Sequence, residues 1–242
     1  MSDSASLVGV VFVSHSSKIA EGLVELARQM APTARLIAAG GTDAEGIGTS
    51  FEKVSAGISS AETGAGVVVL CDLGSAILTA ETARDFLDDA DRDRVVIVDA
   101  PLVEGGVAAA VAAEAGENLA VVVTAALSAN SNPLAPAQAS EGQPSSNQET
   151  APSADEATGY TRTVTLINAD GLHARPAADF VKLATTFPVK ITVNGKDAKS
   201  LLGIMALGLT RGRAVEIRTA DADGRAAVDA LAALIESGFG EA

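Results

Sequence analysis

The run LVGVVFV at residues 7–13, followed by SHSS at residues 14–17, sets the architecture expected for the first half of the chain. Residues 7–13 are strongly apolar and rich in β-branched side chains, which is typical of a strand buried on both faces of a parallel sheet. Helix-like periodicity begins at Ser17, so His15 stands just after the strand and two residues before the helix. The sequence therefore predicts a strand-to-helix junction that carries a histidine.

The same alternation continues through residues 1–126. Short apolar runs at 35–38, 67–71 and 95–98 alternate with amphipathic runs at 17–30, 51–60 and 75–87, and apolar runs at 107–115 and 119–124 complete the unit. Buried strands separated by helical segments favour a parallel sheet with helices on both faces. We expect an open, mostly parallel α/β domain over residues 1–126, with its ligands at the carboxyl ends of the strands.

Residues 127–160 have a different composition. They are rich in Ala, Ser, Pro, Gln and Asn and lack apolar periodicity, which predicts a flexible linker with a typical end-to-end distance of about 30 Å. Charge changes across this segment: residues 1–127 hold 7 basic and 18 acidic side chains, whereas residues 161–242 hold 10 and 9. The two units are therefore not a duplication.

Residues 161–242 predict a second fold. Apolar and polar residues nearly alternate at 162–167 and 190–193, which is typical of a sheet with one face exposed to solvent. A further strand is expected at 214–219. Helical periodicity covers 174–186 and 225–236, with a shorter helix after Ser200, and Asn194-Gly195 is a tight hairpin signal. The pattern predicts a small α+β sandwich.

Composition excludes several classes of protein. The chain is 48% hydrophobic, which rules out wholesale disorder, and its formal net charge of -14 argues against binding to nucleic acid or anionic lipid. No apolar run approaches the roughly 20 residues of a membrane-spanning helix, and the first residues lack the basic start of a secretory signal. A single cysteine, Cys71, fits a reducing compartment, so we expect a cytoplasmic protein without a disulfide or a metal site.

His173 occupies the same kind of place as His15. It follows a strand and opens a helix in the sequence Gly171-Leu172-His173-Ala174-Arg175-Pro176. Helix N-termini present free N–H groups that bind phosphate, and a neutral imidazole is a nucleophile able to attack phosphorus. Each histidine is thus a candidate phosphoryl acceptor, although a lone histidine is more often structural or merely exposed.

Two motifs in the second unit resemble those of HPr, the histidine phosphocarrier of the bacterial phosphoenolpyruvate-dependent phosphotransferase system. They are GLHARPA at residues 171–177 and KSLLGIMALG at residues 199–208. The resemblance implies an open-faced β-sandwich in which His173 carries the phosphoryl group and Arg175 stabilises it. Ser200 matches a position that a regulatory kinase phosphorylates in some bacteria; its alternative role is a helix N-cap.

The first unit resembles the mannose-type enzyme IIA domain, in the form found in the phosphotransfer subunit of dihydroxyacetone kinase, DhaM. The matching stretches are VFVSHS at residues 11–16, GGT at 40–42, GIGTS at 46–50 and DLGSA at 72–76.

Physical roles for the residues in these stretches are open to two interpretations. Asp72 either accepts the ring N–H of His15 and fixes its tautomer, or acts as a capping or turn carboxylate. Gly40 and Gly41 allow close backbone approach at a strand end. Thr42 and Ser75 either line the site and stabilise the phosphoryl group or cap the segments that follow.

These resemblances imply a phosphoryl relay. Phosphate passes from enzyme I to His173, then to His15, and from there to ADP held by the DhaL subunit, which phosphorylates dihydroxyacetone on DhaK. The chain itself then needs no cofactor beyond covalent phosphohistidine, and a homodimer through the first domain is expected. The alternatives are an enzyme IIA that serves a sugar-transporting enzyme IIB, and a non-catalytic module that senses the state of the phosphotransferase system.

Overall fold

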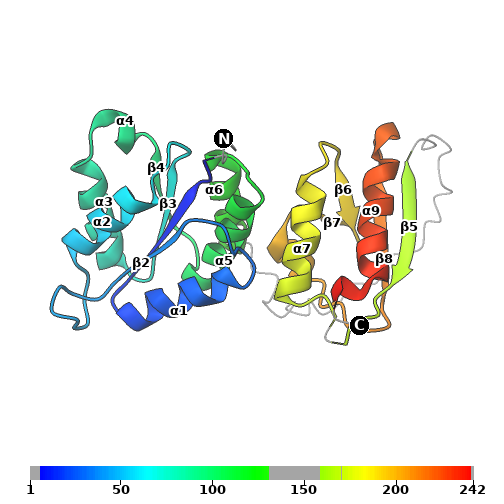
Figure 1. Cartoon of the computed structure of the whole chain (residues 1–242), viewed down its shortest axis with the longest axis horizontal. Coiled ribbons are helices and arrows are strands. Elements are labelled where there is room, and N and C mark those ends of the chain that lie inside the picture. Colours follow the sequence, from blue (N-terminus) through cyan, green and yellow to red (C-terminus); the bar gives the residue numbers. More distant parts are fainter. Residues whose placement is uncertain (1–5, 131–158, 170, 241–242) are drawn as a thin grey trace, which may run out of the picture.

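The computed structural model describes residues 6–130, 159–169 and 171–240, which form two domains (Figure 1). Most of the predicted linker, residues 131–158, lies outside the described residues. Within the described ranges, none of the helices combines the length and the apolar character that crossing a bilayer requires.

The first domain is built on a parallel sheet with the strand order β2-β1-β3-β4. Its strands are β1 (Gly9–Ser14), β2 (Leu36–Gly40), β3 (Val67–Cys71) and β4 (Val95–Val98). β1 is an inner strand, with Ser14 opposite Gly40 of β2 and Val13 opposite Cys71 of β3. The carboxyl ends of these three strands therefore meet at one edge of the sheet.

Helices cover both faces of this sheet. Its helices are α1 (Ser17–Arg28), α2 (Phe51–Ala61), α3 (Gly74–Asp85), the short α4 (Asp89–Arg92), α5 (Leu102–Glu114) and α6 (Leu119–Leu127). Because side chains alternate across a strand, Val10 and Phe12 of β1 face α1 and α5, whereas Val11 and Val13 face α2 and α3. Both faces of β1 are buried, as its apolar sequence predicted.

The apolar runs at 107–115 and 119–124 are parts of helices α5 and α6. α5 packs very closely on the sheet, because a side chain on Gly106 would lie 2.6 Å from the ring of Phe12. A 3₁₀ turn at Ser128–Asn130 follows α6, and the Asn130 side chain donates to the carbonyl of Asp99. The ordered first domain thus extends four residues beyond the predicted boundary at residue 126.

The second domain has an antiparallel sheet in the order β5-β8-β6-β7. Its elements are β5 (Tyr160–Thr165), α7 (Ala174–Thr185), β6 (Ile191–Val193), β7 (Lys196–Asp197), α8 (Leu201–Met205), β8 (Ala214–Thr219) and α9 (Arg225–Glu236), with 3₁₀ turns at Ala222–Gly224 and Gly238–Gly240. Every second residue of β8 is buried, as in a sheet covered on one face only. The positive φ angles of Asn194 and Gly195 make the predicted tight hairpin. The expected fold class is confirmed for both domains.

Candidate functional site

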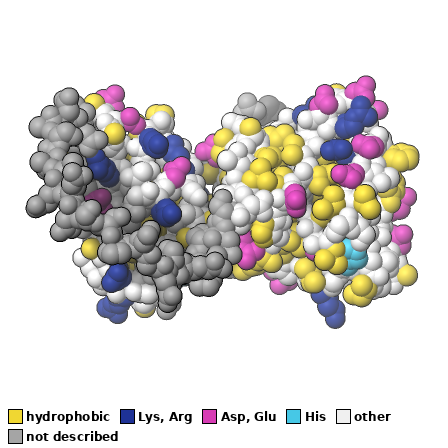
Figure 2. Space-filling view, turned by 180° about the vertical axis from the view of Figure 1, so that it is seen from behind, with side chains coloured by type: hydrophobic (Ala, Val, Ile, Leu, Met, Phe, Trp, Pro, Cys, Tyr) yellow, Lys and Arg dark blue, Asp and Glu magenta, His cyan; other side chains and the backbone are white. Residues whose placement is uncertain are grey.

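His15 lies at the carboxyl end of β1, immediately before the N-cap of α1. Its side chain is 21% exposed, and Figure 2 shows a histidine at the surface of the first domain with hydrophobic side chains beside it. The backbone is held from both sides, since Gly48 N–H donates to the His15 carbonyl (2.9 Å) and the His15 N–H donates to Asp72 (2.8 Å). The backbone of His15 is therefore fixed, and its side chain stays accessible to solvent.

Asp72 follows β3, the neighbour of β1, and its carboxylate accepts four hydrogen bonds. Oδ2 accepts from Ser14 Oγ (2.8 Å) and the His15 N–H (2.8 Å), whereas Oδ1 lies 2.9 Å from His15 Nδ1 and accepts from the Leu73 N–H (2.8 Å). Burial acts to raise the pKa of Asp72, but hydrogen bonds from His15 and Ser14 outweigh it and hold the pKa below the usual value. The carboxylate is ionised at neutral pH.

An ionised Asp72 determines which nitrogen of His15 carries the ring proton. A carboxylate only accepts hydrogen bonds, so Nδ1 must carry the ring proton and Nε2 carries the lone pair in the neutral ring. Ser75 Oγ lies 2.7 Å from Nε2 and donates to it. Nε2, which carries the lone pair, therefore faces the N-terminus of α3, where Ser75 is the second residue.

The glycine loop, residues 40–48 after β2, packs against the backbone around His15. A Cβ on Gly40 would lie 2.6 Å from the carbonyl oxygen of Ser16, so only glycine allows this approach to the start of α1. Gly41 adopts a positive φ of 74° and donates from its N–H to the carbonyl of Ser14 (3.0 Å). Thr42 closes the loop on itself, because its Oγ1 accepts from the Gly46 N–H (3.0 Å).

The structure thus brings Asp72 and Ser75 onto the ring of His15, and it places Gly40 and Gly41 beside the same junction. The hydroxyl of Thr42 is engaged within its loop. Sequence reasoning missed Ser14, which is fully buried, donates to Asp72 and accepts from the Ser16 N–H (3.1 Å). Its signal was a serine at the end of an otherwise apolar strand.

Cys71 precedes Asp72 but takes no part in this arrangement. Burial, followed by the negative charges of Asp72 and Glu81, raises the pKa of the Cys71 thiol to about 12. The thiol stays protonated at neutral pH and is a poor nucleophile.

His173 is the N-cap residue of α7 and is exposed. Gly171, two residues before it, is closely packed: a Cβ on Gly171 would lie 2.2 Å from the carbonyl oxygen of Leu209, and the buried Asn168 amide donates to the Gly171 carbonyl (2.6 Å). Arg175 is an exposed residue in the first turn of α7, two residues after the histidine. The backbone thus places His173 and Arg175 together at the amino end of α7.

Ser200 lies elsewhere in the second domain. It is the N-cap of α8, and its Oγ accepts from the Gly203 N–H (3.2 Å). The structure thus shows the capping role that was the alternative to regulation.

Two family models match the chain. The model described as "PTS system fructose IIA component" matches residues 9–123, and the model described as "PTS HPr component phosphorylation site" matches residues 160–237. These ranges coincide with the two domains and include His15 and His173 respectively.

Curated relatives match the whole chain or one domain. The chain is 37% identical over 246 residues to the "PEP-dependent dihydroxyacetone kinase, phosphoryl donor subunit DhaM" of Klebsiella michiganensis, covering 97% of this chain and 51% of that protein. It is 42% identical over 106 residues to a DhaM of Listeria innocua, covering 43% of this chain and 85% of that protein.

The second domain has a separate relative. The chain is 45% identical over 84 residues to "Phosphocarrier protein HPr" of Cupriavidus necator, covering 33% of this chain and 94% of that protein. The relatives that match 97% of this chain are longer than it is, and the chain spans about half of their length. The match to the first domain covers 85% of the Listeria DhaM, and the match to the second covers 94% of the HPr. The chain therefore belongs to the DhaM family, in a form that carries an HPr domain.

Proposed function

We propose that this chain is the phosphoryl-relay subunit of a phosphoenolpyruvate-dependent dihydroxyacetone kinase. Phosphate enters at His173 from an enzyme I, moves to His15, and leaves to ADP held on a DhaL subunit, which phosphorylates dihydroxyacetone bound to DhaK. The names of the relatives support this assignment. The observation that carries it is the pairing of His15 Nδ1 with Asp72 at 2.9 Å, which leaves the ring's lone pair on Nε2 for attack on phosphorus once Ser75 turns aside.

The transfer to His15 is an in-line displacement. The Nε2 lone pair forms the new N–P bond while the N–P bond to the donor imidazole of His173 breaks, and the bonding pair returns to that ring. The ring proton stays on His15 Nδ1, and the imidazolium character that develops is stabilised by Asp72. Ser75 turns its hydroxyl from Nε2 to a phosphoryl oxygen, and the free N–H groups at the start of α3 stabilise the remaining charge.

At His173, Arg175 and the amino end of α7 supply the matching positive charge. The chain carries phosphate covalently throughout, so the proposal assigns it no cofactor of its own, and ADP belongs to the partner. The proposed setting is the cytoplasm, where enzyme I, DhaL and DhaK would all be accessible. A homodimer through the first domain stays a prediction, to be measured by sedimentation of the full chain.

Radiolabelled phosphoenolpyruvate and purified enzyme I test this order of transfer. His173→Ala is expected to abolish labelling unless free HPr is added, and His15→Ala is expected to trap the label on the second domain. The label should be acid-labile, as phosphohistidine is. Strong labelling of His15 in the His173→Ala chain without added HPr would overturn the order, and acid-stable label would point to Ser200.

The acceptor is tested separately. DhaL loaded with ADP should discharge the labelled chain and, with DhaK, yield dihydroxyacetone phosphate. Discharge by a sugar-specific enzyme IIB, with none by DhaL, would favour the sugar-transport alternative. A chain that binds DhaL but never discharges would favour the regulatory module.

A further inference from the structure

Helix α5 is apolar on two opposite faces. Gly106 packs against Phe12 of the sheet, whereas Ala108, Val111 and Ala112 form a stripe on the other side of the helix. A helix that is apolar all round needs a cover on each face. Within the first domain, α6 packs beside α5, and Val121 and Ala125 line the same cavity as the stripe.

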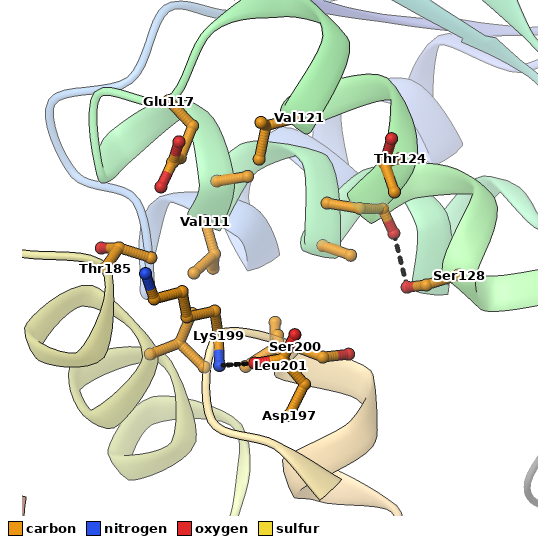
Figure 3. Close-up of a pocket in the computed structure, with 14 residues that line it drawn as sticks. Val111, Glu117, Val121, Thr124, Ser128, Thr185, Asp197, Lys199, Ser200 and Leu201 are labelled. Atoms are coloured by element: carbon orange, nitrogen blue, oxygen red, sulfur yellow. Dashed lines mark hydrogen bonds between the residues drawn. The ribbon is translucent and has the colours of Figure 1, made fainter. Parts of the chain in front are cut away.

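The second domain supplies that cover (Figures 1 and 3). Val181 of α7 and Leu201 of α8 are buried and face the α5 stripe across a shared cavity. The buried apolar side chains of the α5 side of the first domain and those of the second domain form one continuous cluster. Lys182 Nζ of α7 lies 4.0 Å from Glu114 Oε1 at the end of α5.

This contact is packed less tightly than a domain core. It leaves a partly open cavity of about 250 Å³ between the domains, whereas protein interiors are close-packed. Glu117 from the first domain and Asp197 and Lys199 from the second line the cavity, so charged groups stand in this contact where a domain core would have apolar ones. The ion pair between Lys182 and Glu114 is long and part-exposed and contributes little. Such a contact can open without unfolding either domain.

The docked position separates the two histidines. The glycine loop after β2 and the start of α1, which flank His15, lie on the side of the first domain turned away from the second domain (Figure 1). In-line transfer needs reacting atoms about 3–3.5 Å apart, so the docked form cannot pass phosphate from His173 to His15 of the same chain. Residues 131–158 join the domains, and a chain of that length spans at most about 100 Å, enough for the second domain to reach the other side.

We propose that the α5–α6 face is a resting dock for the second domain, and that transfer within one chain goes through an undocked state. The part concerning transfer rests on the proposed function. Linked domains meet at an effective concentration of order mM, so even a weak dock of this kind is well populated. The observed transfer rate then equals the intrinsic rate multiplied by the undocked fraction.

Spin labels on the full chain measure the docked fraction. Cysteines replace the exposed Glu25 on α1 and Glu216 on β8, and the buried Cys71, with its thiol pKa raised to about 12, does not take up label. We expect one narrow distance distribution that does not depend on protein concentration. A broad distribution, or one that sharpens with concentration because a second copy covers α5, would overturn the dock.

Ala112→Glu places a carboxylate on the α5 stripe near Glu117 and should broaden the distribution. Ala226→Glu, which makes the same change on the exposed side of helix α9, is the matched control and should leave it narrow. Lys182→Glu, which turns the ion pair with Glu114 into a repulsion, tests the same contact from the second domain if Ala112→Glu does not fold. A distribution that stays narrow in a folded interface variant would refute the proposal.

Single-turnover transfer of label from His173 to His15 supplies the kinetic readout. The interface variant should transfer faster than the parent chain, by a factor equal to the ratio of the undocked fractions of variant and parent measured with the spin labels. A variant that undocks but transfers no faster would refute the resting role. If no chain labels His15 while the distances behave as expected, the proposed function fails and the dock stands.

Discussion

Asp72→Asn should impair the reactivity of His15 far more than it impairs folding. The four hydrogen bonds to the carboxylate are divided two and two between its oxygens. An asparagine keeps one oxygen, which is best placed against Ser14 and the His15 N–H. Its NH₂ group then faces His15 Nδ1 and becomes a donor to it, so the ring proton moves to Nε2 and blocks the nucleophile.

The size of the effect follows from the same geometry. The equivalent change in a serine protease triad, which also imposes the wrong tautomer, costs about 10⁴-fold. His15 can still attack whenever the ring adopts the minor tautomer, so we expect transfer to slow by about 10²- to 10⁴-fold, or about 3–5 kcal/mol in activation free energy. The Leu73 N–H also loses its acceptor, which costs about 1–3 kcal/mol of folding stability.

Rapid-quench transfer of label from the charged second domain to His15 is the assay, with urea unfolding run in parallel. Asp85→Asn is the matched control, because Asp85 is an exposed carboxylate at the end of α3 with no bond to His15. A folded Asp72→Asn chain that transfers within threefold of the parent would refute the role of Asp72 in fixing the tautomer.

Three further predictions follow from named contacts. Ser75→Ala should slow transfer to His15 about tenfold in the rapid-quench assay. The serine hydroxyl bonds Nε2 before transfer and the charged phosphoryl group during it, and the second bond is the stronger; an unchanged rate would contradict this. Gly171→Ala should destabilise the second domain by about 2–4 kcal/mol in urea unfolding, because φ is +70° and Cβ would lie 2.2 Å from a carbonyl oxygen. The lowered pKa of Asp72 contributes stability that is fully present above the ordinary carboxyl pKa and is lost as pH falls through the folded value. The difference in unfolding free energy between the parent and Asp72→Asn should therefore shrink on acidification. A difference that grows would mean that folding raises the pKa of Asp72 instead of lowering it.

Most strands and helices of both domains could be predicted from the local sequence, because each has a characteristic periodicity of apolar residues. The apolar runs in α5 and α6 do not by themselves indicate helices, because neither helix has a strongly polar face to mark its period. α6 is part-exposed and presents the apolar Val121 and Leu127 to solvent, whereas α5 is buried on almost every side. The reason for that burial lies in the second domain, which no local window of sequence contains.

The site was predictable in part for a related reason. His15 and Asp72 each follow a strand, and parallel strands bring such positions to one edge. Strand order is a non-local property, however, so the pairing of β1 with β3, and hence the contact of Asp72 with His15, became visible only in the structure. Ser14 stands out only as a serine at the end of an apolar strand, a weak signal that does not reveal its bond to Asp72. The hydroxyl of Thr42 closes a loop whose shape the sequence does not specify.

The bond between Asp72 and Nδ1 has a consequence for the return half of the cycle. In the proposed relay Nε2 holds the phosphoryl group, and the same proton on Nδ1 then makes the departing imidazole a neutral leaving group rather than an anion. One carboxylate thus serves loading and unloading alike, and the bound phosphate keeps most of its transfer potential. Such a carrier runs close to equilibrium, so the direction of flow is set by the concentrations of the proteins on either side.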